Sequence, residues 1–371
     1  MKRIIVSVTN DLVTDQRVHK VCTSLMAMGF EIVLIGRKLP TSLAIDRDYR
    51  TIRMPLLFNK GFLFYAEYSL RLFLKLFFLK KDILLSNDLD TLLPNYIISK
   101  LFNKELVYDS HELFTEIPER EGRTGVKGVW ERIERYIFPK LKRVYTVNDS
   151  IASFYKEKYK VGVQVVRNMA PELIDKTIDQ ELAKNIKGDQ KMIILQGSGL
   201  NIDRGAEEAV AMMQYIDHGI LYIIGGGDVF EKLKALVITL KLQDKVFIKN
   251  KMPYDALMEY TKIADLGLSL DKGMNLNYEY SLPNKVFDYI QAETPLLVSN
   301  RKEIAKLVNE NNIGKVVDSH DPKELANIVN GIFADEQQLE TWQNNLKKAA
   351  KKYTWENESK KLKEIFHHLN K

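Results

Sequence analysis

Short apolar runs alternate with helical patterns along almost the whole chain. The first run spans residues 4–8, and the segment after it repeats apolar residues at helical spacing, namely Val18, Val21, Leu25 and Met28. Residues three or four apart share one face of a helix, so this segment is predicted to be an amphipathic helix. The alternation of strand-like and helical segments predicts an α/β fold with parallel sheets covered by helices on both faces.

The alternation occurs twice, with a polar stretch between the two sets. The strand-like runs lie at residues 4–8, 32–35, 83–85, 106–108, 144–147 and 163–166, and then at 193–195, 221–224, 246–248, 266–270 and 296–298. A chain of 371 residues exceeds the size at which one hydrophobic core keeps growing. We therefore predict two doubly wound, Rossmann-like domains at residues 1–168 and 192–354, joined by a connection at 169–191.

Composition and charge narrow the class of protein. Apolar residues make up 45% and charged residues 28%, which is ordinary for a globular protein. Cys22 is the single cysteine, so no intramolecular disulfide forms, and the amino terminus lacks the long apolar core of a signal peptide. We expect a cytoplasmic protein. A net charge of +6 suits anionic small ligands or an acidic membrane face, while no basic block interleaved with aromatics indicates nucleic-acid binding.

Ligands of open α/β sheets bind at the carboxyl ends of the strands, and two such domains facing each other would leave a cleft there. In the second domain the loops at 196–205 and 225–228 are rich in small residues. The glycines that would let the backbone approach a diphosphate are Gly197, Gly199, Gly225 and Gly226. Arg204 could hold the diphosphate with its planar fork. The alternative is a flexible turn followed by a solvated arginine at a helix start.

A third loop, residues 281–290, combines a helix start with two charges. Pro283 presets the first helical turn, so a helix is predicted from there to Ala292. The free N–H groups of a helix start attract phosphate, and Lys285 adds a full charge. Asp288, one turn on, could accept hydrogen bonds from ribose hydroxyls. The alternative is an ordinary capped surface helix.

Several segments together resemble a known family. They are Asp203-Arg204-Gly205, the glycine triplet at 225–227, the run at 281–290 and the closing Tyr353-Thr354-Trp355-Glu356, and they resemble glycosyltransferase family 4, which has the GT-B fold. Asn10-Asp11, residues 15–18 and residues 108–114 are similar to a bacterial branch of that family that builds cell-surface polysaccharides. In that fold the carboxyl-terminal segment, here 355–371, is expected to pack back on the first domain.

The resemblance implies a retaining glycosyltransferase that moves a sugar from a nucleotide-sugar donor to a saccharide or lipid-linked saccharide acceptor. It implies neither cofactor nor metal, and a peripheral contact with the inner membrane is compatible with it. The catalytic set would be His111, Arg204 and Lys285. The donor-binding set would be Gly197, Gly199, Arg204, Gly225, Gly226, Ser281, Asn284, Lys285 and Asp288. The acceptor-side set would be Asn10, Asp11, Arg17, Asp109 and Glu112.

The motif departs from the family at one place. Family members often carry two glutamates across this motif, the first of which touches the donor sugar, and here Ser281 and Asp288 stand in their places. Serine supplies no carboxylate. Glu279 could substitute if the loop bends it inward, and Asp288 keeps the charge on a shorter arm.

Three other functions have some support in the sequence. Asp88-Leu89-Asp90 has the carboxylate spacing of a metal-dependent glycosyltransferase of the other major fold, although Asp90 with Thr91 is equally a helix start. A nicotinamide-dependent oxidoreductase also pairs doubly wound domains, but neither glycine loop completes G-x-G-x-x-G. A non-catalytic nucleotide-binding partner of a transferase complex is the third.

The most apolar stretch is residues 61–81, in which Glu67, Arg71 and Lys75 recur every four residues. That spacing gives one polar stripe on a helix, and such charges disfavour a membrane span. Two interpretations remain. Either the helix is buried against the sheet, or its Phe-rich face and Lys80-Lys81 lie on the anionic inner membrane surface.

Overall fold

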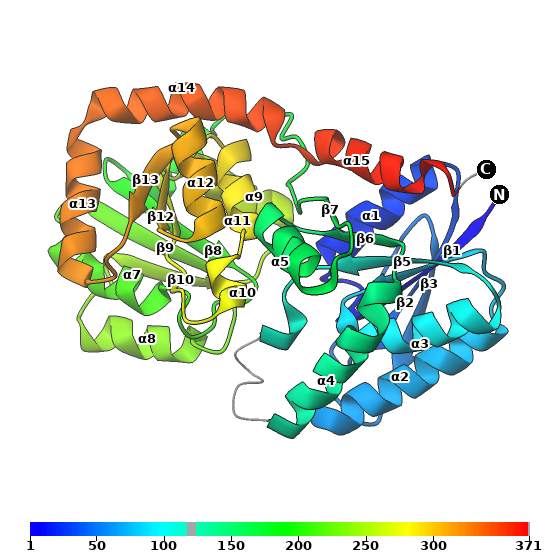
Figure 1. The fold of residues 1–371 in the computed structure, drawn as a ribbon. Coiled ribbons are helices and arrows are strands. Elements are labelled where there is room, and N and C mark those ends of the chain that lie inside the picture. The colour runs from blue at the N-terminus through cyan, green and yellow to red at the C-terminus, as the bar shows by residue number, and fades with distance from the viewer. Residues whose placement is uncertain (117–123, 370–371) are drawn as a thin grey trace. The chain divides into compact units, whose positions relative to one another are not determined.

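The computed structural model describes residues 1–116 and 124–369. The chain divides into two compact units, residues 1–168 with 357–371 and residues 169–356. In each unit a parallel sheet lies between layers of helices (Figure 1). The predicted fold class, two doubly wound α/β domains, is confirmed.

The amino-terminal unit contains a seven-stranded sheet in the order β3-β2-β1-β4-β5-β6-β7. Its strands are β1 (Arg3–Asp11), β2 (Glu31–Lys38), β3 (Arg50–Pro55), β4 (Ile83–Asn87), β5 (Glu105–Ser110), β6 (Arg143–Thr146) and β7 (Gln164–Val165). Its helices are α1 (Gln16–Ala27), α2 (Gly61–Phe78), α3 (Leu89–Leu101), α4 (Thr124–Ile137), α5 (Asp149–Tyr159), most of α15 (Trp355–His367) and the short η1 (Phe114–Glu116) and η3 (Phe138–Lys140). The strand order reverses between β1 and β4, which pair in parallel with Ile5 opposite Leu84.

The carboxyl-terminal unit contains a six-stranded parallel sheet in the order β10-β9-β8-β11-β12-β13. Its strands are β8 (Lys191–Gly197), β9 (Gly219–Gly225), β10 (Val246–Asn250), β11 (Leu266–Ser269), β12 (Leu296–Ser299) and β13 (Gly314–Val317). Its helices are α6 (Gln180–Lys187), α7 (Ala206–Met212), α8 (Phe230–Thr239), α9 (Tyr254–Ile263), α10 (Leu276–Glu279), α11 (Asn284–Gln291), α12 (Lys302–Asn311), α13 (Pro322–Ala334), α14 (Glu336–Lys352) and the short η4 (Met213–Tyr215). Here the strand order reverses between β8 and β11.

Alternate residues of each central strand belong to different cores. Ile193 and Leu195 of β8 pack in the cluster that includes α7 and α8. Met192 and Ile194, which point to the other face, pack in the cluster that includes α11 and α12. Because successive side chains of a strand point to opposite faces, a strand covered on both sides reads as an unbroken apolar run. This is why the central strands were predictable from the sequence.

Some elements differ from the sequence prediction. The edge strands β3 and β13 were not predicted, and the connection at 169–191 contains the helix α6. The helix predicted from Pro283 begins at Asn284, with Pro283 as the N-cap residue. Asp321 caps α13, since its side chain accepts hydrogen bonds from the main-chain N–H groups of Lys323 and Glu324.

Candidate functional site

The candidate donor site lies at the carboxyl ends of β8 and β11. These two strands flank the point where the strand order of the sheet reverses, and such a switch point is where doubly wound sheets bind ligands. The loop after β8 carries Arg204, and the loop after β11 carries Asp271. Helix α11, which carries Lys285 and Asp288, begins a short distance further along the chain.

The glycine loops pack against each other by their backbones. A β-carbon at Gly225 would lie 1.8 Å from the main-chain oxygen of Gly197. The neighbouring Gly226 donates its N–H to that same oxygen at 3.1 Å. Gly225 also has φ of +150°, which side chains seldom permit. Gly199, in contrast, has no atom within 4 Å of its β-carbon position. Gly225 is therefore required by the packing of the two loops, while Gly199 leaves open space.

Three buried or half-buried charges meet at the centre of this site. Arg204 donates from Nη1 to Asp271 Oδ1 at 2.8 Å, and its guanidinium lies 4.2 Å from the centre of the Tyr278 ring. Asp271 is 2% exposed and Lys285 is 8% exposed. Burial alone would raise the pKa of Asp271, but the charges of Lys285 and Arg204 outweigh it and hold that pKa below its ordinary value.

This cluster has an excess of positive charge. Burial lowers the pKa of Lys285, the attraction of Asp271 offsets part of that effect, and the nearby Arg204 adds to the lowering. Two cations therefore share one carboxylate in a poorly solvated place. An anion that entered here would stabilise both cations, and a diphosphate has the charge and the oxygen atoms to do so.

Asp288 is oriented by residues from two other elements. Gln196 of β8 donates from Nε2 to Asp288 Oδ2 at 3.0 Å, and the Tyr254 hydroxyl, at the start of α9, donates to Oδ1 at 2.9 Å. Gln196 is fixed in turn by Thr261, whose hydroxyl donates to its Oε1 at 2.8 Å. A carboxylate has further lone pairs, so Asp288 keeps the capacity to accept a hydroxyl of a ligand.

The remaining predicted donor-side residues have different surroundings. Asn284 is exposed at the first position of α11, and Ser281 is half-buried, with its main-chain N–H donated to Tyr278 at 3.2 Å. Glu279 does not stand free to replace the missing glutamate, because its Oε2 accepts a hydrogen bond from Arg301 Nη1 at 2.7 Å. A β-carbon at Gly273 would lie 2.0 Å from Arg301, so only glycine fits beside this ion pair.

In the amino-terminal unit, three predicted residues come together with one that was considered for metal binding. Arg17 donates two hydrogen bonds to Asp109, from Nη2 at 2.7 Å and from Nε at 3.1 Å, and both side chains are buried. His111 lies with Nε2 at 3.1 Å from Asp109 and Nδ1 at 3.2 Å from Asp88. The main-chain N–H of His111 also donates to Asp88, at 2.8 Å.

This network favours the doubly protonated form of His111. Ionised carboxylates only accept hydrogen bonds, so both ring nitrogens are satisfied when both carry protons. Burial would lower the pKa of His111, but the charges of Asp88 and Asp109 outweigh it and raise that pKa well above its ordinary value. Burial would likewise raise the pKa of Asp109, and Arg17 and His111 reverse the direction.

The other acceptor-side residues have separate partners. Asn10 donates to Asp15 at 2.9 Å, and Asp11 lies 3.2 Å from Arg53. Glu112 accepts a hydrogen bond from Ser110 at its main-chain oxygen.

The carboxylate pair Asp88 and Asp90 does not converge. Asp90 accepts from the Thr9 hydroxyl at 2.6 Å, while Asp88 binds His111. Over residues 1–116 and 124–369, no group of three or more His, Cys, Asp or Glu side chains is arranged to hold a metal ion.

Sequence reasoning missed Asp271, Gln196 and Tyr254. Asp271 follows a predicted strand by one residue, and the rule that ligands bind at carboxyl ends of strands could have singled it out. Gln196 stands in the loop that was considered, although only its glycines and arginine were chosen. Nothing in the pattern around Tyr254 marks it, because its role depends on where α9 packs.

Comparison with known proteins identifies a family domain in the carboxyl-terminal unit. Residues 177–352 match the family model of glycosyl transferases group 1. No curated protein matches the chain at a significant level.

Similar solved structures extend over the whole chain. Sucrose-phosphate synthase from Thermosynechococcus elongatus has a TM-score of 0.81 at 17% identity, with 100% of this chain and 99% of that one covered. HepE from Anabaena, solved with UDP-glucose, has a TM-score of 0.74 at 12% identity, with 100% of both covered. WaaG, a glycosyltransferase involved in lipopolysaccharide biosynthesis, has a TM-score of 0.70 at 14% identity, with 98% and 99% covered. This likeness establishes the fold.

Proposed function

We infer the donor, the acceptor and the stereochemistry of the transfer from one premise. The premise is that this chain is a glycosyltransferase with a group 1 glycosyl transferase domain at residues 177–352. We propose that it moves a sugar from a nucleotide-sugar donor to a saccharide or lipid-linked saccharide acceptor, with retention at the anomeric carbon. The product would be a cell-surface polysaccharide, made at the cytoplasmic side of the membrane. The complex of HepE with UDP-glucose and the lipopolysaccharide role of WaaG are consistent with this proposal.

The observation that carries the proposal is the excess positive charge of Arg204 and Lys285 around Asp271. These residues lie at the switch point of the sheet, beside the two glycine loops, whose backbones pack against each other. As the bond from the anomeric carbon to the diphosphate breaks, negative charge grows on the leaving oxygen. Cations already in place stabilise that charge more in the transition state than in the ground state.

Asp288 is the proposed ribose contact. Its carboxylate is already held by Gln196 and Tyr254, so little side-chain freedom would be lost on binding. Around it, Gly197, Gly199, Gly225, Gly226, Ser281 and Asn284 are the proposed donor contacts. Because Glu279 is paired with Arg301, the sugar would have to be recognised without that carboxylate.

The chemical step needs no protein base in the mechanism we propose. The acceptor oxygen bonds to the anomeric carbon on the face from which the diphosphate leaves, and its proton passes to an oxygen of the leaving phosphate.

His111 is assigned to the donor sugar by the family resemblance. Its two carboxylate partners occupy both ring nitrogens, so it supplies no free lone pair for proton abstraction. Asn10, Asp11, Arg17, Asp109 and Glu112 are the proposed acceptor-side set.

Release of nucleoside diphosphate tests the proposal. The protein is incubated with UDP-, GDP- and ADP-sugars and with saccharide acceptors, and one donor is expected to be consumed with its anomeric configuration retained, as seen by NMR of the product. Because Arg204 and Lys285 would neutralise the diphosphate, EDTA should leave the rate unchanged. Inversion at the anomeric carbon would refute the retaining mechanism, and activity abolished by EDTA and restored by Mn²⁺ would refute the metal-free site.

A further inference from the structure

Helix α2 is apolar on both of its faces. One face is buried in the unit, through Phe64, Tyr68, Leu72 and Leu76. The opposite face carries Phe62, Leu63, Leu70, Leu74, Phe77 and Phe78, whose exposed fractions run from 43% for Phe77 to 79% for Phe78. A surface helix is normally polar on its outward face, so an apolar row of this length indicates a contact with something outside the unit.

Glu67, the acidic side chain of this helix, is engaged in hydrogen bonds and adds no unpaired negative charge to the exposed face. Glu67 accepts hydrogen bonds from the main-chain N–H groups of Leu57 and Phe58, and Arg71 donates to it at 2.8 Å. The exposed row is therefore apolar with one further cation, Lys75, in the last turn.

The apolar row continues onto the neighbouring helix. Helices α2 and α3 pack side by side (Figure 1). At the end of α3, Leu101 and Phe102 are exposed, and the ring of Phe102 lies 5.3 Å from that of Phe77. We call these eight residues, six on α2 and two at the end of α3, the apolar platform.

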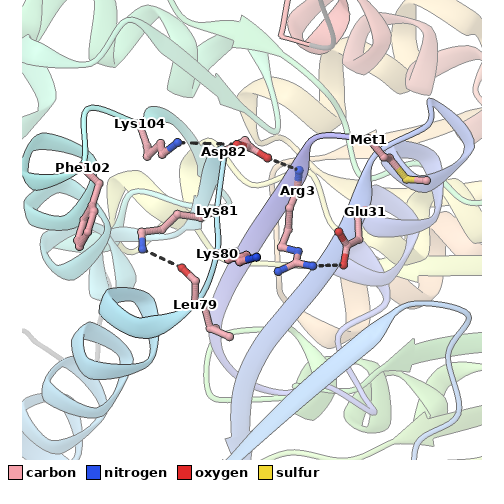
Figure 2. Close-up of a pocket in the computed structure, with 9 residues that line it drawn as sticks. All are labelled: Met1, Arg3, Glu31, Leu79, Lys80, Lys81, Asp82, Phe102 and Lys104. Atoms are coloured by element: carbon pink, nitrogen blue, oxygen red, sulfur yellow. Dashed lines mark hydrogen bonds and ion pairs between the residues drawn. The ribbon is translucent and has the colours of Figure 1, made fainter.

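A cationic cavity of about 430 Å³ opens at the same end of α2. Figure 2 shows its lining, which consists of Met1, Arg3, Glu31, Leu79, Lys80, Lys81, Asp82, Phe102 and Lys104. Arg3 begins β1 and Glu31 begins β2, so the cavity lies at the amino-terminal edge of the sheet, away from the site residues at the carboxyl ends. It is a separate feature from the network around His111.

The cavity has more positive than negative side chains. The four cations are Arg3, Lys80, Lys81 and Lys104, and the two carboxylates are Glu31 and Asp82. Arg3 pairs with Glu31 at 2.6 Å, and Lys104 lies 3.8 Å from Asp82. Lys81 donates to the main-chain oxygen of Leu79 at 2.8 Å and lies 4.1 Å from the centre of the Phe102 ring. Burial and the nearby Lys104 lower the pKa of Lys81, so a phosphate close by would stabilise its charged form.

We propose that the apolar platform lies on an anionic lipid surface and that the cavity receives the phosphate of one lipid headgroup. The biological purpose rests on the proposed function, because a lipid-linked acceptor would be met at that surface. An 18-residue helix is about 27 Å long and lies flat in this arrangement. No helix in the described part of the chain is long and apolar enough to cross a bilayer. The cations beside the platform favour an anionic membrane over a neutral one.

Vesicle sedimentation of the full-length protein tests the platform. The vesicles contain phosphatidylcholine alone or with a quarter of phosphatidylglycerol, and no nucleotide-sugar is present. The double variant Leu70→Ser with Phe78→Ser should lower partitioning onto the anionic vesicles at least tenfold, because both side chains are highly exposed. Its melting temperature should stay near that of the unaltered protein. Ile238→Ser, which removes an equally exposed apolar side chain from α8 in the other unit, is the matched control.

The cavity is tested by a charge change. Lys80→Glu should weaken binding to anionic vesicles about fivefold or more and leave the weak binding to neutral vesicles unaltered. Lys234→Glu on α8 is its control.

Three results would overturn the inference. They are no sedimentation of the unaltered protein, equal sedimentation of all variants, or a dimer in ultracentrifugation that the Leu70→Ser, Phe78→Ser variant dissociates, which would assign the platform to a second copy. Because no donor is present, these outcomes are independent of whether the proposed transfer occurs.

Discussion

Lys285 and Asp288 lie one turn apart on α11. Lys285 is the proposed diphosphate contact, and Asp288 is the proposed ribose contact. Replacing either by alanine should weaken binding of the nucleoside diphosphate by about 1.5 to 3 kcal/mol, the value of a hydrogen bond to a charged group. Calorimetric titration measures this. Lys234→Ala, which removes an exposed lysine from α8, should leave the affinity unchanged. Unaltered affinity in both α11 variants would remove them from the donor site.

His111 gives the amino-terminal unit a stability that depends on pH. Its surroundings are Asp88, Asp109, Arg17 and, next to Arg17, Tyr145. The carboxylates raise its pKa in the folded state above the unfolded value of about 6.5. The stabilisation is therefore complete below about pH 6.5 and is lost as the pH rises through the folded-state pKa.

The variant His111→Gln should thus lose roughly 1.5 to 3 kcal/mol of unfolding free energy at pH 6, and its difference from the unaltered protein should shrink as the pH rises. Urea denaturation at pH 6, 7, 8 and 9 follows the difference. His218→Gln, at an exposed position in the other unit, serves as the control. A difference that does not vary with pH would show that His111 is neutral.

At the scale of elements, the two glycine loops make opposite predictions. Gly225→Ala places a methyl group against the main chain of Gly197, and overpacking of this kind costs about 1 to 3 kcal/mol of unfolding free energy. Gly199→Ala meets no atom and should leave stability nearly unchanged. Thermal denaturation of both variants checks the pair. Equal melting temperatures would mean that the loops do not pack as described.

The sequence predicted the central elements better than those at the edges. Strands such as β8 are covered on both faces and read as apolar runs. In contrast, β3 is an edge strand, Arg50-Thr51-Ile52-Arg53-Met54-Pro55, in which only Met54 is buried. In α2 the polar stripe of Glu67 and Arg71 could be predicted from the sequence. The sequence did not show which apolar face of α2 is buried, because both faces are apolar and the choice depends on how α2 packs against α3 and β1.

At the scale of the whole molecule, the sequence indicated the two α/β units and the positions of Arg204, Lys285 and Asp288. It did not indicate that Asp271 would join the two cations, because that contact brings together residues 67 positions apart. The sequence did not indicate that Gln196 and Tyr254 would contact Asp288, for the same reason. A pattern marks charges and glycines locally, while the partner of a side chain is decided by the order of the strands.

The central claim is that the carboxyl-terminal unit binds a nucleoside diphosphate through Arg204 and Lys285. The most direct measurement is the shift in melting temperature of the full-length protein with UDP, GDP, ADP and NAD. A ligand that binds only the folded state stabilises it by about 2.7 kcal/mol at a hundredfold excess over Kd. The account predicts a shift with at least one of the nucleoside diphosphates, no shift with NAD, and loss of the diphosphate shift in Lys285→Ala. A shift with NAD alone, or a diphosphate shift that persists undiminished in Lys285→Ala, would contradict it.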